Sequence, residues 1–205
     1  MLLLTGRRRT IVAACITAVL LAAATALWFG ADVWVQFFAK VVPQQRGLLD
    51  TGDGLLLPMT SAPLLSMRFM GLPLKIAWVV QYIVSALALA AVAWTYWRRR
   101  DPVLSTALLV MATFLFAPYT LGYDMPIIAW VVVLLTQRTD NTRFDHQLAI
   151  AAWMLPFAMP VIGGLSGVPV GFFVMLALGT RLLWRLAHAP GRGEVTDNHD
   201  MALAR

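Results

Sequence analysis

Charged residues are scarce in this chain. Asp, Glu, Lys and Arg make up 13% of its 205 residues, against about 25% in soluble domains, whereas 60% are hydrophobic. Such a composition excludes an ordinary water-soluble fold. Because a helix needs ~20 mostly apolar residues to cross ~30 Å of hydrocarbon, the chain has room for about six spans and little else. This composition predicts an all-α, polytopic membrane helix bundle whose main partner is the lipid bilayer.

Cysteine is nearly absent, since Cys15 is the single one and lies inside an apolar run; this excludes an internal disulfide and a cysteine metal site. The sequence has no phosphate-binding glycine loop, no His-Glu-x-x-His motif and no serine nucleophile elbow. His146, His188 and His199 stand in polar segments, so we expect no metal and no cofactor. Because most basic residues flank apolar runs, the net charge of +6 indicates membrane orientation and not nucleic-acid binding.

Apolar stretches separated by polar or proline-containing segments predict the membrane spans. The predicted spans are residues 10–29, 74–97, 103–117, 125–136, 148–162 and 168–186. Pro156 and Pro160 should bend the fifth. The first stretch has an alternative interpretation as a secretory signal peptide, with Ala24-Thr25-Ala26 as its cleavage site, but it is longer than the usual ~7–15 residue core of such peptides. A signal peptide would leave five spans.

The longest polar interruption covers residues 31–73. Within it, DVWVQFFAKVV has the three- and four-residue spacing of a helix lying in the membrane interface, ended by Pro43 or by the glycines at 52–54. A second short helix should begin at Thr60 or Ser61 and end at Gly71. We expect both to be wall or lid elements of one transmembrane domain.

Lys and Arg are distributed unevenly over the predicted connections. With the N-terminus inside, 12 of the 16 fall on the inner side, a positive-inside bias that fits an even number of spans. We therefore predict a multi-pass protein of a bacterial-type inner membrane, with both termini cytoplasmic. Residues 1–187 form the transmembrane domain, and the polar residues 188–205 a disordered cytoplasmic tail.

On this topology the 31–73 segment and the sequence APYTLGYD, residues 117–124, lie on the same outer side. An acid at membrane depth costs roughly 2.5–3.5 kcal/mol, which makes Asp124 a candidate site residue, although it could equally cap the fourth span. Arg68 and Lys75 could hold the phosphate of a lipid carrier, or could reach toward the headgroups.

Three further polar side chains lie near these segments. Tyr119 and Tyr123 could contact a sugar, although aromatic residues of this kind usually form the interfacial belt. Gln81, inside a span, should hydrogen-bond a neighbouring helix.

The run from Ser61 through Arg68 and Gly71 to Gln81, followed by the break at 117–124, resembles the C-terminal half of glycosyltransferase family 87, also catalogued as domain of unknown function 2029. The resemblance extends to about Leu186. It implies a GT-C-type bundle, similar to mannosyltransferases that take a sugar from a polyprenyl-phosphate donor on the outer face. It also implies that Arg68 pairs with the phosphate while Asp124 orients the groove.

The resemblance has a consequence for the catalytic base. Enzymes of this type carry their catalytic acid in the first outer loop of a chain about twice as long, and Asp32, Asp50 and Asp53 do not match it. The expected function is therefore a hexosyltransferase-like protein, truncated or inactive alone, whose base is lacking or comes from an upstream N-terminal half polypeptide. The alternative is a non-enzymatic membrane subunit or small transporter in which Asp124 relays protons or ions.

Overall fold

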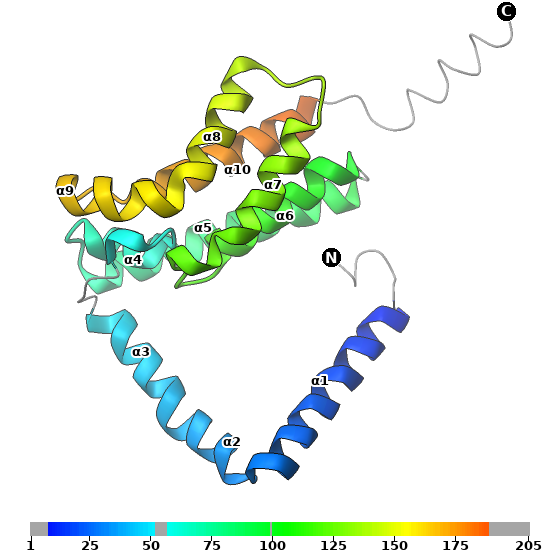
Figure 1. Ribbon diagram of the computed structural model, residues 1–205, viewed down its shortest axis with the longest axis vertical. Coiled ribbons are helices and arrows are strands. Elements are labelled where there is room, and N and C mark those ends of the chain that lie inside the picture. The colour runs from blue at the N-terminus through cyan, green and yellow to red at the C-terminus, as the bar shows by residue number, and fades with distance from the viewer. Residues whose placement is uncertain (1–7, 52–56, 99, 189–205) are drawn as a thin grey trace, which may run out of the picture. The chain divides into compact units, whose positions relative to one another are not determined.

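The computed structural model describes residues 8–51, 57–98 and 100–188 (Figure 1). All regular structure in these ranges is helical, which confirms the predicted all-α class. The chain divides between residues 53 and 54 into two compact units, each described below by itself. The tail predicted at 188–205 lies outside the described residues, apart from His188, which ends the last helix.

The first unit is a helical hairpin. Helix α1 (Arg8–Phe29) is followed by Gly30, whose φ of +89° is the left-handed conformation that lets the chain reverse. The next three elements follow each other without a break: α2 (Asp32–Gln36), the π-helical η1 (Phe37–Val41) and α3 (Val42–Thr51). The indole Nε1 of Trp34 in α2 donates a 3.3 Å hydrogen bond to Thr25 Oγ1 in α1, which links the two arms.

The helix predicted around residues 33–41 is present, but it does not end at Pro43. Proline lacks an N–H and its ring collides with the preceding turn of an α-helix. Here the wider π-helical turn comes directly before α3, so Pro43 falls in the first turn of that element and the helix continues to Thr51.

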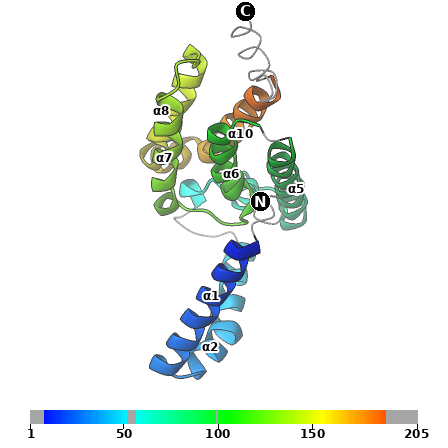
Figure 2. The same cartoon turned by 90° about the vertical axis from the view of Figure 1, so that its right-hand side faces the viewer.

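The second unit is a bundle. It begins with η2 (Leu57–Met59), α4 (Pro63–Phe69), α5 (Leu74–Trp97) and α6 (Pro102–Phe116). It continues with η3 (Gly122–Asp124), α7 (Pro126–Thr136), α8 (Arg143–Ala158), the π-helical η4 (Met159–Gly163), α9 (Gly164–Ser166) and α10 (Val170–His188). Helix α6 is central, because it packs against α5, α7 and α10 (Figure 2). Fully buried Met111, Val131 and Met175 are part of the core.

Local sequence explains several helix ends. Asp101 Oδ1 accepts hydrogen bonds from the N–H groups of Val103 and Leu104 at 2.8 and 3.0 Å, which starts α6. Helix α4 starts differently from our expectation: its N-cap is Ala62, which makes no side-chain bond there. Its end agrees, since Gly71 has a φ of +80° and its N–H donates to Arg68 O at 2.9 Å.

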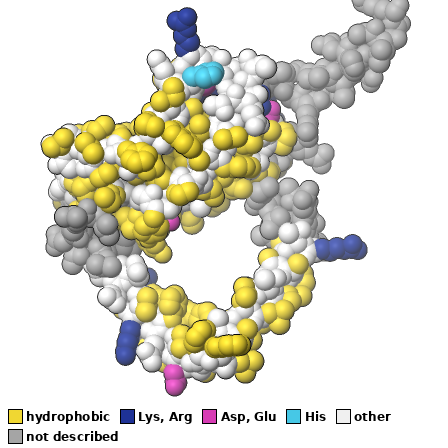
Figure 3. All heavy atoms as spheres, in the orientation of Figure 1, with side chains coloured by type: hydrophobic (Ala, Val, Ile, Leu, Met, Phe, Trp, Pro, Cys, Tyr) yellow, Lys and Arg dark blue, Asp and Glu magenta, His cyan; other side chains and the backbone are white. Residues whose placement is uncertain are grey.

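Each predicted span coincides with a helix. Within the described residues, four helical runs are long and apolar enough to cross a bilayer, at residues 9–29, 74–97, 143–166 and 170–188. The third extends the predicted 148–162 at both ends. Helix α8 begins at Arg143, and η4 takes up Pro160 in a π-helical turn without ending the helix. Helices α6 and α7, with 15 and 11 residues, are shorter, so a six-span count stays a prediction. Hydrophobic side chains cover much of the face seen in Figure 3, as expected for lipid contact.

Candidate functional site

Two segments that are far apart in sequence meet at one end of the second unit. Thr60 Oγ1 donates to Thr120 O at 3.1 Å, and the Ser61 N–H donates to the same oxygen at 3.3 Å. The hydroxyls of Ser61 and Thr120 lie 2.9 Å apart. All three residues are buried. The segment before α4 and the break between α6 and α7, which we expected on one side of the membrane, are therefore in contact.

Gln81 of α5 connects the same end to two more elements. Its Oε1 accepts the N–H of Leu64 in α4 at 2.9 Å, and its Nε2 donates to Phe116 O of α6 at 3.0 Å and to Ser85 Oγ at 2.8 Å. Gln81 is 2% exposed. This confirms the hydrogen bond to a neighbouring helix that was expected from the sequence. The one side chain of Gln81 also connects three elements, α4, α5 and α6.

Two glycines lie where α10 and η4 pack closely against residues 58–60. A Cβ on Gly171 of α10 would lie 2.9 Å from Thr60 O and would collide with the Met159 side chain. A Cβ on Gly163 of η4 would lie 3.1 Å from Pro58 O. At Gly171 the approach to Thr60 is therefore too close for a Cβ unless its neighbours move, and at Gly163 a Cβ would require a small shift of Pro58.

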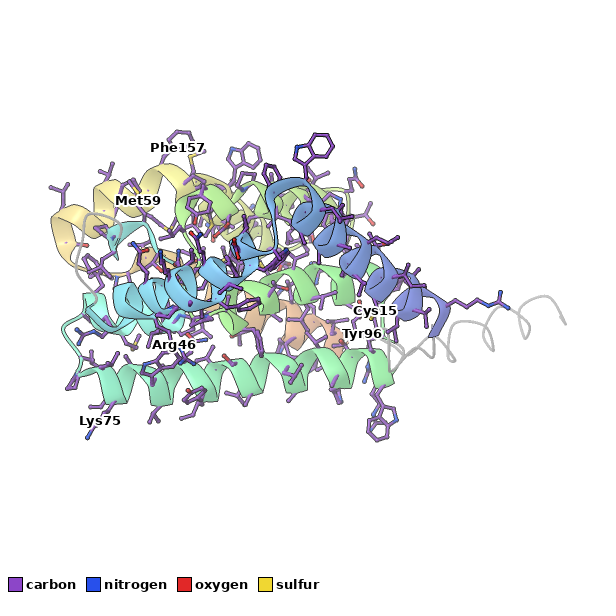
Figure 4. All side chains as sticks on the ribbon, turned by 90° about the horizontal axis from the view of Figure 1, so that it is seen from below. Cys15, Arg46, Met59, Lys75, Tyr96 and Phe157 are labelled. Atoms are coloured by element: carbon purple, nitrogen blue, oxygen red, sulfur yellow. The ribbon has the colours of Figure 1, made fainter. Side chains whose placement is uncertain are left out.

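The cationic candidates differ in burial. Arg68 is half-buried and its Nη1 donates to Leu72 O at 3.1 Å, which holds the guanidinium beside the C-terminal turn of α4. Lys75 is exposed in the first turn of α5, and Figure 4 shows it pointing away from the bundle. Arg68 and Asp124 form no ion pair with each other among the described residues.

Asp124 does not cap the fourth predicted span, contrary to one of our two expectations. The N-cap of α7 is Met125, which makes no side-chain bond, whereas Asp124 Oδ2 accepts the N–H of Leu121 at 3.0 Å within its own 3-10 turn. Asp124 is half-buried. Its neighbours Tyr119 and Tyr123 are 48% and 73% exposed, so both rings lie on the surface of this end.

The opposite end of the unit holds an ion-pair network that the sequence analysis missed. It consists of three arginines and three aspartates from α10, the start of α8 and the connections before α6 and α8: Asp101, Arg138, Asp140, Asp145, Arg181 and Arg185. The shortest contact joins Arg181 Nε to Asp145 Oδ1 at 2.7 Å, and the Asp145 side chain is only 4% exposed. Its three positive and three negative charges balance, so the network is neutral and links the ends of three helices. Among the described residues, no three His, Cys, Asp or Glu side chains group as metal ligands.

Arg138 controls the acidity of two of these aspartates. Its hydrogen bonds to Asp140, at 2.8 and 2.9 Å, hold the pKa of that carboxyl well below its usual range. Burial opposes ionisation of Asp101, but hydrogen bonds from the Leu104 N–H and from Arg138 outweigh it and lower the pKa of Asp101. Both aspartates therefore stay charged at neutral pH.

An apolar groove lies between α5, α6 and α10, with a volume of about 560 Å³. Fourteen residues line it, among them Ala88 and Ala91 of α5, Ala112 of α6 and Gly179 of α10. Neither Arg68 nor Asp124 lines it.

The fold and these sites define an integral membrane protein of apolar helices. The family model of glycosyltransferase family 87 matches residues 1–118, more than half of the chain. The chain belongs to glycosyltransferase family 87. No curated protein and no solved structure matches it.

The matched residues divide the candidate site. They include Arg68, Lys75 and Gln81, whereas Tyr119, Tyr123 and Asp124 follow the end of the match. The matched residues also stop well before Leu186, to which we expected the resemblance to extend. Family membership therefore directly supports a role in the site for α4 and the start of α5. It supports the break after α6 only through the contacts of that break with Thr60 and Ser61.

Proposed function

We propose that this protein is a hexosyltransferase that takes a sugar, in the first place mannose, from a polyprenyl-phosphate donor on the outer face of the cell membrane. Its family membership supports glycosyl transfer. The observation that carries the location is the buried contact between Ser61 and Thr120, because it holds α4 and the break after α6 at one end of the bundle. The donor phosphate binds at this end.

Arg68 is the residue we assign to the phosphate. A guanidinium can form two parallel hydrogen bonds to phosphate oxygens, and charge-assisted bonds are roughly twice as strong as neutral ones. The bond from Nη1 to Leu72 O fixes one side of the group and supports its orientation. Lys75, exposed in the first turn of α5, adds positive charge for a lipid-linked anion.

Asp124, Tyr119 and Tyr123 form the other half of the proposed site. Because Oδ2 of Asp124 is bonded to Leu121 and no described residue bonds Oδ1, one carboxylate oxygen can accept a sugar hydroxyl. The exposed rings of the two tyrosines supply flat apolar surface with a polar edge, which suits both sugars and lipid headgroups. The reaction also requires a catalytic base, a carboxylate that removes the proton of the acceptor hydroxyl as the phosphate leaves. We assign this role to no residue.

Transport through Asp124 has no comparable support. A proton or ion relay needs polar groups along a path through the bundle. The groove between α5, α6 and α10 is apolar, and Asp124 is not among its lining residues. Glycosyl transfer is therefore the function that the described residues support best.

The test is sugar transfer from radiolabelled polyprenyl-phosphate mannose in membranes that contain the chain, alone and with a co-expressed N-terminal half from a longer family member. Arg68→Ala should raise the KM for the donor by about tenfold or more, equivalent to ~1.4 kcal/mol. Asp124→Asn should lower kcat/KM as well. The matched control is Arg143→Ala, an exposed arginine at the start of α8.

Each outcome of this test has a definite meaning. If both site variants have wild-type kinetics, the assignment of the phosphate site to this end is wrong, but the proposed transferase activity is not contradicted. Absence of transfer by the wild-type chain in both settings, with the chain present in the membrane, would overturn the enzymatic proposal.

A further inference from the structure

Helix α4, which carries Arg68, has no side-chain cap of its own. It has seven residues, and its N-cap, Ala62, makes no side-chain hydrogen bond there. Pro63 has no N–H, so Leu64 carries the first N–H of the helix. This N–H donates to Gln81 Oε1 of α5 at 2.9 Å. A side chain from another helix therefore supplies the acceptor that a capping residue ordinarily provides.

The amide of Gln81 has one orientation in which all of these hydrogen bonds form. Its Nε2 donates to Ser85 Oγ at 2.8 Å and to Phe116 O at 3.0 Å, while its Oε1 accepts the N–H of Leu64. If the amide were turned over, its NH2 group would face the Leu64 N–H and its oxygen would face the Phe116 carbonyl. The contacts of Nε2 with α5 and α6 therefore aim the amide oxygen at the start of α4.

Arg68 lies one helical turn after the residue that Gln81 holds. Residues four apart lie on the same face of a helix, so Leu64 and Arg68 share a face of α4. The other end of α4 is joined to α5 by the short connection 70–73, where Leu72 O accepts a 3.1 Å hydrogen bond from Arg68 Nη1. Gln81 fixes the start of α4 against α5, and the connection fixes its end. The direction of α4, and with it the place of the guanidinium, depends on both.

We propose that Gln81 is a positioning residue, which orients Arg68 for the phosphate of the donor without contacting the donor. This inference rests on the proposed function, because it takes Arg68 as the phosphate-binding residue. Gln81 is 2% exposed, so its amide is shielded from a headgroup and acts only through the elements that it bonds. Both residues lie among those that match the family.

An apolar side chain in place of Gln81 would fill the space without holding α4 in one place. Apolar packing is non-directional, whereas a hydrogen bond weakens steeply as its angle departs from linearity. Leu64 and Leu65 are buried, so α4 would still pack after such a change, but its rotation against α5 would be less restricted. A guanidinium that binds phosphate through two parallel hydrogen bonds is sensitive to a shift of this kind.

The first experiment measures Gln81→Met and Arg68→Ala, singly and together, in the transfer assay with polyprenyl-phosphate mannose. Methionine is unbranched like glutamine and has no N–H to donate. We expect Gln81→Met to raise the KM for the donor about fivefold, equivalent to ~1 kcal/mol, with kcat within about twofold of wild type. Added to Arg68→Ala, Gln81→Met should raise the KM no further, because both changes remove the same contact.

Two controls separate positioning from a general loss of stability. Val131→Ala removes packing at a fully buried position of α7, so it should lower the melting temperature and leave the KM unchanged. Gln147→Leu, at an exposed position of α8, should change neither. Gln81→Asn is the second variant, should Gln81→Met fail to accumulate. Its amide, one methylene shorter, does not reach Leu64 and Phe116 together.

The second experiment measures the position of α4 without any transfer. In a Cys15→Ser background, Arg68→Cys places a single thiol on α4, because Cys15 is the one cysteine of the chain. We expect Gln81→Met to raise the rate at which a maleimide alkylates this thiol at least about threefold, since a helix released at one end opens more often. Val131→Ala should leave this rate unchanged.

The two experiments fail in different ways. An unchanged alkylation rate in Gln81→Met would overturn the positioning role, whether or not transfer is observed. A KM that rises about fiftyfold in the double variant, the product of two independent effects, would also overturn it, because Gln81 would then not act through Arg68. A raised alkylation rate without transfer by the wild-type chain would instead overturn the proposed function, and Gln81 would position α4 for no donor.

Discussion

The side-chain oxygen of Gln81 accepts a hydrogen bond from the backbone N–H of Leu64 at 2.9 Å, across seventeen residues of sequence. The same side chain donates to Phe116 O, so one amide serves α4, α5 and α6. Gln81→Leu would leave the buried Leu64 N–H without this partner, at a cost of about 1–3 kcal/mol, whereas Phe116 O would keep the 3.1 Å hydrogen bond from Ser85 Oγ. We expect a fall of about 1–2 kcal/mol in the free energy of unfolding, because polar bonds between membrane helices contribute on this scale.

The measurement for Gln81 is the melting temperature of the protein in a mild detergent. Gln147→Leu makes the same chemical change at an exposed position of α8 and should be close to neutral. If both variants melt at the wild-type temperature, Gln81 does not hold α4 in place.

Gly171 and Gly164 form a matched pair for close packing. Gly171→Ala places a methyl group 2.9 Å from Thr60 O and against Met159, whereas Gly164→Ala meets nothing within 4 Å. Overpacking costs typically 1–3 kcal/mol, so we expect Gly171→Ala to lower stability by about that amount. Gly164→Ala should be neutral or stabilise by up to ~1 kcal/mol, since alanine favours helix. Denaturation in detergent distinguishes them, and equal effects would contradict the close approach of α10 to Thr60.

Asp145 is the most buried acid of the ion-pair network. Asp145→Asn would leave Arg181 with a neutral partner and Arg185 without its 3.6 Å charge contact. Breaking a buried pair by removing one charge costs about 3–5 kcal/mol. We expect a large drop in melting temperature and poor accumulation in the membrane.

Asp140→Asn is the comparison for Asp145, because Asp140 is an acid of the same network whose side chain is 55% exposed. Solvent screens exposed pairs, which contribute about 0–1 kcal/mol. A loss in Asp140→Asn as large as in Asp145→Asn would show that burial does not determine the strength of this network.

Acid should weaken the same end of the bundle. The pKa of Asp140 is lowered by the hydrogen bonds from Arg138, and that of Asp101 is also lowered. A carboxyl whose folded pKa lies below its unfolded value of about 3.9 stabilises the fold above that value and loses this contribution as the pH falls toward the folded pKa. The melting temperature should be level between about pH 5 and 7 and fall below about pH 4. Asp140→Asn should flatten this decline, and an unchanged profile would contradict the shift.

Much of the fold could be predicted because spans are local features. An apolar run of sufficient length needs no distant partner to become helical in lipid, and the predicted 74–97 matches α5 residue for residue. The 3-10 turn at Gly122–Asp124 and the π-helical turn at η4 could not be predicted, because they depend on how neighbouring helices fill the space that prolines leave. The predicted N-cap of α4 was wrong for a similar reason, because the side chains of Thr60 and Ser61 hydrogen-bond to Thr120 of a distant segment.

The ion-pair network was missed because arginine has two roles at a membrane surface. Arg138, Arg181 and Arg185 were counted as orientation signals. Local spacing pairs Arg138 only with Asp140, two residues away, whereas Asp101 is 37 residues from Arg138 and Asp145 is 36 residues from Arg181. One signal was readable: Thr142 and Asp145 have the spacing of a capping box, which indicated the start of α8 at the helix end where the network lies. The roles of Arg68 and Asp124 stay predictions.

The orientation of the second unit can be tested because Cys15 is the single cysteine. In a Cys15→Ser background, Lys75→Cys marks the start of α5 and Arg143→Cys the start of α8, both exposed positions at opposite ends of the bundle. Since most Lys and Arg residues belong on the cytoplasmic side, Lys75→Cys should react with a membrane-impermeant maleimide in intact cells. Arg143→Cys should react only after permeabilisation.

The short helices make this prediction informative. Helices α6 and α7, with 15 and 11 residues, span about 22 and 16 Å at 1.5 Å per residue, less than the ~30 Å core. If both cross, residue 75 and residue 143 lie on opposite sides of the bilayer, because α5, α6 and α7 make three crossings between them. If α6 and α7 instead form a re-entrant pair, one crossing remains and the sides are again opposite. A third label, Tyr123→Cys, separates the two cases. Two crossings from residue 75 return Tyr123 to the outer side, whereas a re-entrant pair leaves it within the membrane and unreactive to the impermeant reagent.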